Sequence, residues 1–293
     1  MQLWPESEIS SSGKEVPLIL HYNCLRQRSM DPTSNEGLML VNIPKIIMQT
    51  WKNKTIPEKW QASHRSIEEL MPDWSYVLMT DEDNRNFVAE HFPDFLETYD
   101  SLPYPIVKAD AIRYMWLYIN GGIYLDLDYQ LEAPLDPLFY QGSGLYFMKS
   151  PNFPSHYTNS VMASVPRHPF WLELIDMIRE AKNTVPIWTS LNRHFSIMYI
   201  AGPGMLSRAI SSTSYPYTTI PYLSVAPCDI CTKVCDRPRY LTPLGGASWA
   251  EWDSVTISWA LCYPWYTVGV LILMIILAIV MVVMLLKWYQ RGR

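Results

Sequence analysis

The sequence predicts an α/β domain with a mixed, mostly parallel sheet flanked by helices, followed by one C-terminal transmembrane helix. Strand-like and helix-like patterns alternate along the first part of the chain, which is typical of a sheet covered by helices. The length of 293 residues allows one sizeable buried core with a membrane segment added. An uncharged apolar run near the C-terminus is about long enough to cross a bilayer.

The pattern of apolar residues assigns each element in turn. Short apolar runs and period-2 alternation predict strands, whereas apolar residues three and four positions apart predict helices. The helix over 81–92 also begins with an acidic cap. Strands are expected at Ile43–Thr50, Trp74–Thr80 and Leu145–Met148, and helices at Glu58–Met71, Asp81–Phe92 and His168–Ala181.

The most informative segment reads KADAIRYMWLYINGGIYLDLDY and begins at Lys108. Its first part has apolar residues at helical spacing and predicts a helix over Lys108–Ile119. Gly121 and Gly122 then end the helix, because glycine adopts the left-handed conformation of a C-cap without steric cost. A short apolar strand, Ile123–Leu125, follows and leads directly into two acidic residues.

Asp126 and Asp128 are separated by one apolar residue, Leu127. On a strand the two carboxylates would project from the same face, since successive side chains alternate. Two such carboxylates can hold a hard divalent cation, Mn²⁺ or Mg²⁺, which a diphosphate leaving group requires. The pair therefore predicts a metal site, with Asp128 as the expected direct ligand. A solvated turn is the alternative.

Several segments together resemble glycosyltransferase family 32, the DXD-containing glycosyltransferases. NIPKIIMQTWK (42–52), GPGML (202–206) and GGASW (245–249) resemble the family's other elements and occur in the same order. Within the family, the chain is most similar to the fungal catalytic subunits that mannosylate inositol phosphorylceramide, and PRHPFW (166–171) adds to this likeness. Two positions depart from the pattern, because Met48 and Ala250 stand where the family often has histidine.

The resemblance implies a donor site around the carboxylate pair. The implied donor-binding residues are Trp51, Asp110, Arg113, Tyr124, Asp126, Ser248 and Trp249. Asp110, Arg113, Asp126 and Asp128 are the implied catalytic residues. Asp110 and Arg113 would hold the hydroxyls of the donor sugar, and Trp51 would stack on the nucleotide base.

Each of these assignments has a simpler alternative. Asp110 and Arg113 could form a surface ion pair, and Trp51 and Tyr124 could be core aromatics. Ser248 and Trp249, read as closing over the diphosphate, could belong to an ordinary turn. Asn159 could reach the substrate from a loop, although a side-chain bond within a turn is the commoner use of asparagine.

The resemblance further implies a GT-A fold, retention of anomeric configuration, Mn²⁺ (or Mg²⁺) as cofactor, and GDP-mannose as donor. The expected acceptor is inositol phosphorylceramide at a membrane, and a regulatory subunit is a further partner to consider. Two other classes stay open. One is a glycosyltransferase for protein-linked or polysaccharide glycans, and the other is a catalytically inactive sugar-binding relative.

The apolar run Val268–Leu286 predicts a single membrane span with aromatic residues at both ends. The expected division is a polar lead-in (1–37), a catalytic domain (38–262), the span (266–287) and a basic tail (288–293). By the positive-inside rule the basic tail is cytosolic and the domain is lumenal, and the family resemblance implies the Golgi as the compartment. The first residues do not resemble a signal peptide. A C-terminal anchor without a signal peptide would instead favour tail insertion and a cytosolic domain. The aromatic stretch 252–266 is expected near the headgroups.

Other features narrow the function. The net charge of −5 argues against a nucleic-acid partner. The sequence also lacks the glycine-rich phosphate loops of ATP and dinucleotide sites. Cys228, Cys231 and Cys235 have the spacing of half a zinc site, with Cys262 as the nearest fourth ligand. In a lumenal protein one disulfide with a spare thiol is the preferred interpretation.

Overall fold

The computed structural model describes residues 43–139, 142–151, 155–190, 192–226, 229, 231–232, 234, 239–246 and 250–291. Six strands form the central sheet, in the order β2 (Ser75–Met79), β1 (Ile46–Thr50), β3 (Gly122–Leu125), β6 (Tyr157–Ser164), β5 (Leu145–Lys149) and β7 (Thr218–Ile220). The pairs β1–β2, β1–β3 and β5–β7 are parallel, whereas β6 is antiparallel to both β3 and β5. The predicted α/β class, a mixed sheet flanked by helices, is confirmed.

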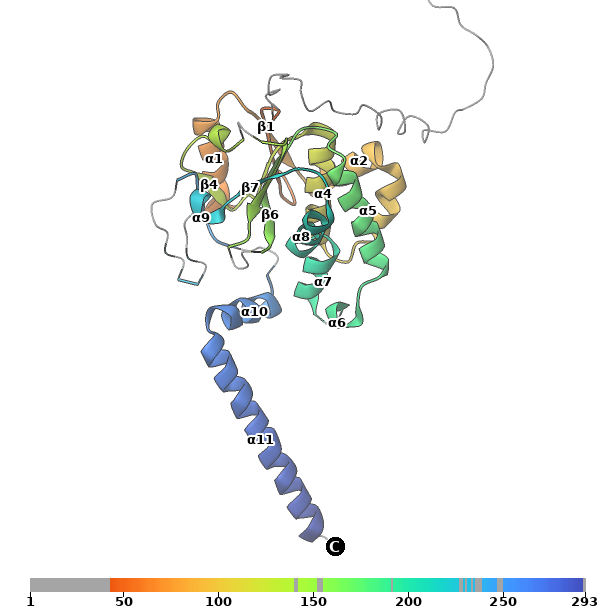
Figure 1. Cartoon of the computed structure of the whole chain (residues 1–293), viewed down its shortest axis with the longest axis vertical. Helices are drawn as coiled ribbons and strands as arrows, with labels where there is room; N and C mark the ends of the chain where they lie inside the picture. The colour runs from red at the N-terminus through yellow and green to blue at the C-terminus, as the bar shows by residue number, and fades with distance from the viewer. Residues whose placement is uncertain are drawn as a thin grey trace, which may run out of the picture. The chain divides into compact units, whose positions relative to one another are not determined.

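Helices cover both faces of this sheet (Figure 1). Side chains alternate along the strands, so that Met48 and Tyr124 join one core and Ile47 and Ile123 join the other. The first core includes residues of α4 (Pro105–Asn120), α5 (Phe170–Asn183), α7 (Arg193–Ile200) and α8 (Pro203–Ser212). The second includes α1 (Gln61–Leu70), α9 (Tyr222–Val225) and the two-stranded sheet of β4 (Tyr129–Leu131) and β8 (Leu241–Pro243). The shorter or peripheral helices are α2 (Asp81–His91), α3 (Leu96–Asp100) and α6 (Ile187–Ser190).

The predicted elements are present with ends shifted by a few residues, and β6 is the main addition. All but one of the eight residues of β6 are buried, and polar and apolar residues are mixed along it. Its sequence, YTNSVMAS, therefore lacks the alternation that predicts a strand. Asn159 consequently lies in a central strand and not in the loop that the sequence suggests.

The predicted glycine stop lies between α4 and β3. Gly121 and Gly122 have φ angles of 65° and 83°, a region that favours glycine. A Cβ atom at Gly122 would collide with the carbonyl oxygen and side chain of Ile46 on the neighbouring strand β1. The close approach of β3 to β1, and hence the position of the residues after β3, depends on this glycine.

We expect Gly122→Ala to lower the apparent Tm of the detergent-solubilised chain, because it adds about 1–3 kcal/mol of backbone strain and also a backbone clash. Gly245→Ala is the matched control, since Gly245 has a φ of 72° but no atom within 4 Å of its added Cβ. Thermal unfolding of both variants measures the difference. Equal shifts in Tm would mean that the contact with Ile46 is unimportant.

Two helices end the chain. Most of the aromatic stretch 252–266, to which the sequence analysis assigned no secondary structure, is the helix α10 (Trp252–Cys262). The next helix, α11 (Pro264–Arg291), has 28 residues and is long and apolar enough to cross a membrane. No residue in its most apolar part is buried against the rest of the described chain. This agrees with the predicted C-terminal span, although the described helix begins before residue 266 and continues beyond 287.

The described cysteines form a disulfide between Cys231 and Cys262, with 5.4 Å between the Cα atoms. A disulfide sulfur cannot serve as a thiolate ligand, so the zinc interpretation is wrong for Cys231. The partner of Cys231 is also outside the expected cluster of three. Cys228 and Cys235 lie outside the described residues, as does the lead-in 1–37.

Candidate active site

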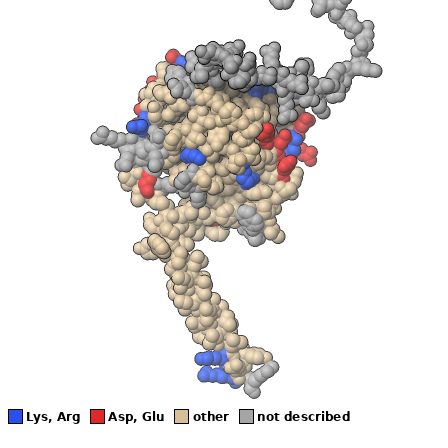
Figure 2. Space-filling view, in the orientation of Figure 1, with Lys and Arg blue, Asp and Glu red and all other residues tan. Residues whose placement is uncertain are grey.

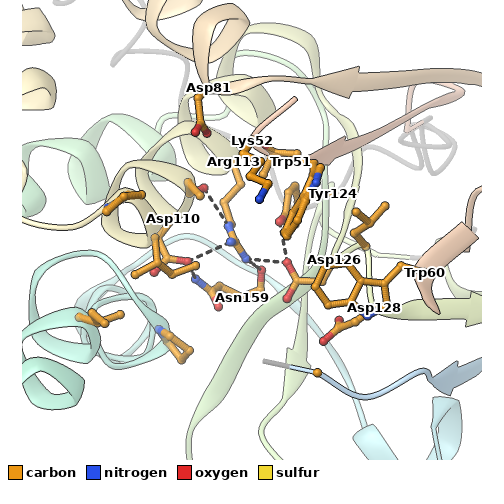
Figure 3. Close-up of a pocket in the computed structure, with 18 of the residues that line it drawn as sticks. Trp51, Lys52, Trp60, Asp81, Asp110, Arg113, Tyr124, Asp126, Asp128 and Asn159 are labelled. Atoms are coloured by element: carbon orange, nitrogen blue, oxygen red, sulfur yellow. Dashed lines mark hydrogen bonds and ion pairs between the residues drawn. The ribbon is translucent and has the colours of Figure 1, made fainter. Parts of the chain in front are cut away.

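A cavity of about 430 Å³ lies at the carboxyl ends of β1 and β3, where ligands tend to bind in α/β sheets. Its charged and amide lining residues are Lys52, Asp81, Asp110, Arg113, Asp126, Asp128, Asn159 and Arg193. Trp51, Trp60 and Tyr124 add aromatic surface. Figure 3 shows the cavity with Asp110 and Asp128 on either side of Asp126. Most of the residues singled out from the sequence are thus brought together at one place.

The two acidic residues of the Asp-x-Asp motif follow β3 and do not form part of it. The strand ends at Leu125, and Leu127 and Asp128 lie in a turn before β4. A backbone hydrogen bond from Tyr129 N to Asp126 O, 3.3 Å long, belongs to this turn. The argument from strand alternation is therefore wrong in detail, but both carboxylates line the cavity.

Arg113 connects the acidic residues on the floor of the cavity. Its Nη2 lies 3.0 Å from Asp110 Oδ1, and its Nη1 lies 3.0 Å from Asp126 Oδ1. Nη1 also donates to the carbonyl oxygen of Asn159 at 2.8 Å. Asp110 and Arg113 are each only 3% exposed, so the alternative of a surface ion pair is wrong.

Two further side chains complete this network. The Asn159 Nδ2 donates to Asp110 Oδ1 at 2.8 Å and to the Tyr114 hydroxyl at 3.0 Å. The Tyr124 hydroxyl donates to Asp126 Oδ1 at 2.6 Å, and the guanidinium of Arg113 lies 4.4 Å from the centre of the Tyr124 ring. Tyr124 is therefore both a core aromatic and a residue that positions Asp126.

Burial and mutual repulsion raise the pKa values of three acidic groups that line the cavity. Burial raises the pKa of Asp110 to about 6, against the lowering influence of Arg113. Burial also raises the pKa of Asp126, and burial together with the charge of Asp126 raises the pKa of Asp128 to about 7. Burial lowers the pKa of Arg113, but Tyr124, Asp126 and Asp110 together raise it, so the guanidinium stays charged.

The aromatic side of the cavity is formed by Trp51 and Trp60. Their rings meet edge to face with centroids 5.0 Å apart. The Nε1 of Trp60 donates to the carbonyl oxygen of Gly245 at 2.9 Å, whereas the buried Nε1 of Trp51 has no partner among the described residues. Trp60 and Asn159 are cavity residues that the sequence analysis did not assign to the donor site. Trp60 carries only a core-like helical pattern there, so nothing in the sequence marks it.

The segment after β8 also reaches the cavity. Gly246 lines it, and the backbone N–H of Leu244 donates to the carbonyl oxygen of Asp128 at 2.7 Å. Ser248 and Trp249 lie outside the described residues, so their predicted contact with the diphosphate stays a prediction. Met48 is fully buried in the core and does not line the cavity, and neither does Ala250. Neither departure from the family pattern therefore removes a described lining residue.

Comparison with known proteins identifies the family to which the chain belongs. The family model described as "Glycosyltransferase sugar-binding region containing DXD motif" matches residues 57–144, which include Asp126, Leu127 and Asp128. An inositol phosphoceramide mannosyltransferase 2 of Schizosaccharomyces pombe is 34% identical over 258 residues, covering 86% of this chain and 68% of the relative. The chain belongs to the family of DXD-containing glycosyltransferases.

Two other relatives are matched by this chain over a smaller share of their length. Inositol phosphoceramide mannosyltransferase 3 of S. pombe is 44% identical over 56% of this chain and 44% of the relative. Mannosyl phosphorylinositol ceramide synthase CSH1 of Saccharomyces cerevisiae is 38% identical over 64% of this chain and 53% of the relative. The chain thus spans about half the length of these two relatives.

Solved glycosyltransferase structures are more distant from this family member. The PaToxG glycosyltransferase has a TM-score of 0.41 at 18% identity, covering 57% of this chain and 69% of that chain. The galactosyltransferase LgtC, solved with donor and acceptor sugar analogues, has a TM-score of 0.35 at 14% identity, covering 60% and 73%.

The family's DXD carboxylates fit a divalent cation in this cavity. Asp126 and Asp128 line the same space, and burial followed by the charge of Asp126 raises the pKa of Asp128. The Asp128 carboxylate has no ion pair with a described residue, so it is available as a ligand. Among the described residues no third acidic, histidine or cysteine side chain completes a metal cluster. The remaining coordination positions would be taken by donor oxygens and water, as is usual for Mg²⁺-type sites.

Proposed function

We propose that this chain is a membrane-anchored, metal-dependent retaining glycosyltransferase that transfers mannose from GDP-mannose to inositol phosphorylceramide. The observation that carries the proposal is the single cavity that contains both the DXD carboxylates and the buried Asp110–Arg113 pair. A nucleotide sugar needs both, because its diphosphate is anionic and its hexose carries several hydroxyl groups. The GT-A assignment is part of the same proposal.

The donor would lie along the cavity from the tryptophans to α4. The Trp51 ring, at the end of β1 and next to Trp60, offers a flat face for the guanine base. Asp126 and Asp128 would hold the cation that neutralises charge on the diphosphate as the glycosidic bond breaks. Asp110 and Arg113 would orient the hexose through charge-assisted hydrogen bonds.

Retention without a covalent intermediate would depend on positioning. The attacking hydroxyl of the acceptor would approach the same face that the diphosphate leaves, and the leaving phosphate oxygen would accept its proton. The chain's own contribution would be a fixed geometry and preorganised charge around the anomeric carbon. Arg113 is suited to this role, because contacts with Asp110, Asp126 and the Asn159 carbonyl hold its guanidinium in place.

The acceptor assignment is supported by the names of the fungal relatives and by α11. Those relatives are called inositol phosphoceramide mannosyltransferases, and α11 is long and apolar enough to cross a membrane. Purified full chain in detergent should therefore transfer mannose from GDP-mannose to inositol phosphorylceramide when Mn²⁺ is present. Efficient transfer to a soluble glycan without a lipid product would favour the protein or polysaccharide alternative. No donor hydrolysis with any nucleotide sugar would favour the inactive relative.

We also propose that the domain is lumenal, in the Golgi. Lys287 and Arg291 follow the apolar run, and disulfides such as Cys231–Cys262 form in oxidising compartments. A tag after Arg293 should then be digested by protease in sealed vesicles while the domain from residue 43 onward is protected. Protection of the tag with digestion of the domain would show the opposite topology.

A further inference from the structure

Arg193 lines the cavity where the first turn of α7 reaches it, and this part of the cavity is the α7 end. It is the first residue of α7, and its guanidinium carbon lies 5.1 Å from the ring centre of Tyr104, the residue before α4. The described cations that line the cavity are Lys52, Arg113 and Arg193. Arg113 is engaged with the acidic floor, and Lys52 lies beside Trp51, 5.6 Å from its ring centre. Arg193 is therefore the cation of the α7 end.

The wall around Arg193 differs from the rest of the cavity. It is formed by apolar side chains from the start of α4, from α7 and from the start of α8, namely Pro105, Ile106, Ile197, Met198 and Pro203. No carboxylate of the DXD motif contacts this end through a described interaction. An apolar wall with one cation suits a ligand that combines an anionic group with apolar surface.

The same end of α7 is attached to the helix that precedes the membrane span. Glu251 Oε1, immediately before α10, lies 3.4 Å from Arg193 Nε. Asp253 Oδ2 accepts a hydrogen bond of 2.8 Å from the backbone N–H of His194, the next residue of α7. The first two residues of α7, Arg193 and His194, thus connect the cavity to the start of α10.

The opposite face of α10 is apolar and exposed. Trp252, Val255 and Trp259 are 78%, 61% and 45% exposed, whereas Asp253 and Ser254 on the other face are buried. The Trp259 ring contacts Tyr263, which in turn contacts Tyr266 in α11, so the aromatic row continues into the predicted span. Figure 2 shows no charged residue of the visible face along α10 and most of α11. Exposed tryptophan and tyrosine rings next to an apolar helix are typical of residues at the membrane–water interface.

We propose that the α7 end of the cavity is the acceptor subsite, and that Arg193 binds the phosphodiester of a membrane-lipid headgroup presented beside α10. This inference rests on the proposed function and names a binding residue for its acceptor. The guanidinium would donate two hydrogen bonds to the phosphate oxygens, a geometry that arginine provides and lysine does not. The inositol beyond the phosphate would then extend toward Asp126 and the donor hexose.

The test compares three variants of the full chain in detergent micelles. Arg193→Gln should raise the KM for inositol phosphorylceramide by about 10-fold or more, since the charge-assisted hydrogen bonds to the phosphate are lost. The kcat and the Kd for GDP-mannose should stay within about twofold, because the donor end is unchanged. Arg193→Lys should give an intermediate KM. Glu251→Gln is the matched control, because it removes the ion pair to α10 but leaves the cation, and its KM should stay near the wild-type value.

Soluble glycerophosphoinositol provides a second measurement that does not depend on the lipid surface. It should inhibit the wild-type chain competitively with the lipid acceptor and inhibit Arg193→Gln much less. Equal increases in KM for Arg193→Gln and Glu251→Gln would mean that Arg193 only attaches α10, and would overturn the proposal. A weakened Kd for GDP-mannose would place Arg193 in the donor site and overturn it as well. Absence of any lipid product from the wild-type chain would instead contradict the proposed function.

Discussion

Asp128→Asn is expected to lower the rate of hexose transfer by at least about 100-fold, the cost typical of losing one electrostatic contact to a transition state. The substitution removes a charge that a divalent cation needs and keeps the shape of the side chain. Because Asp128 has no ion pair with a described residue, the domain should remain folded with a Tm close to that of the wild type. Product formation measured across a Mn²⁺ titration should show a weaker response to the metal.

Asp94→Asn is the control for this prediction, since Asp94 is exposed and does not line the cavity. Asp126→Asn should also reduce transfer severely, but it should lower the Tm too, because Asp126 Oδ1 contacts Arg113 and Tyr124. Comparing Asp128→Asn with Asp126→Asn thus distinguishes the loss of a metal ligand from the loss of the hydrogen bonds to Arg113 and Tyr124. If either variant kept wild-type turnover in the presence of a chelator, the metal assignment would be wrong.

Asp110→Ala is expected to reduce both stability and transfer. Removing one partner of a buried ion pair costs about 3–5 kcal/mol, because the other charge is left in a low-dielectric site. Asp110 and Arg113 are buried, and Asn159 would lose an acceptor as well. Asp110→Asn keeps the size of the side chain and should cost less stability while still reducing transfer.

The control for stability is the exposed pair formed by Arg85 and Asp100, whose atoms approach to 2.8 Å. Asp100→Ala should leave both unfolding and kinetics near those of the wild type, because exposed ion pairs contribute little. A role of Asp110 in holding the hexose predicts reduced kcat/KM for the nucleotide sugar with an almost unchanged Kd for the bare nucleoside diphosphate. Normal kinetics in a folded Asp110→Asn would leave the residue with a purely structural role.

The sequence predicts the parts of the fold that have a regular apolar period or a glycine with a required backbone conformation. The helix that carries Asp110 and Arg113, the stop at Gly121 and the long C-terminal helix are all recognisable in this way. The strand β6 is not, because it is buried on both faces and mixes polar with apolar residues. Its tertiary surroundings stabilise it, and those surroundings cannot be read from a local pattern.

The sequence also predicts only part of the candidate site. Family motifs identify Asp126, Asp128 and the Asp110–Arg113 pair, but they do not show that Arg113 joins Asp110 to Asp126. Asn159 is the clearest case, since its role depends on β6 lying beside α4. Trp60 likewise lines the cavity and donates a hydrogen bond to the carbonyl oxygen of Gly245, 185 positions later in the chain. Contacts over such separations leave no periodic signal in the sequence.

The hydrogen bonds around Arg113 have a consequence for the affinity of the donor. Fixing a flexible side chain during association costs about 0.5–1.5 kcal/mol in conformational entropy. In this chain the guanidinium is already restrained by Asp110, Asp126 and the Asn159 carbonyl before any ligand arrives. That ordering therefore takes place when the polypeptide folds, and a sugar that enters the cavity meets a rigid arrangement of charges. Its dissociation constant should accordingly depend more on shape and charge complementarity than on rearrangement of the floor.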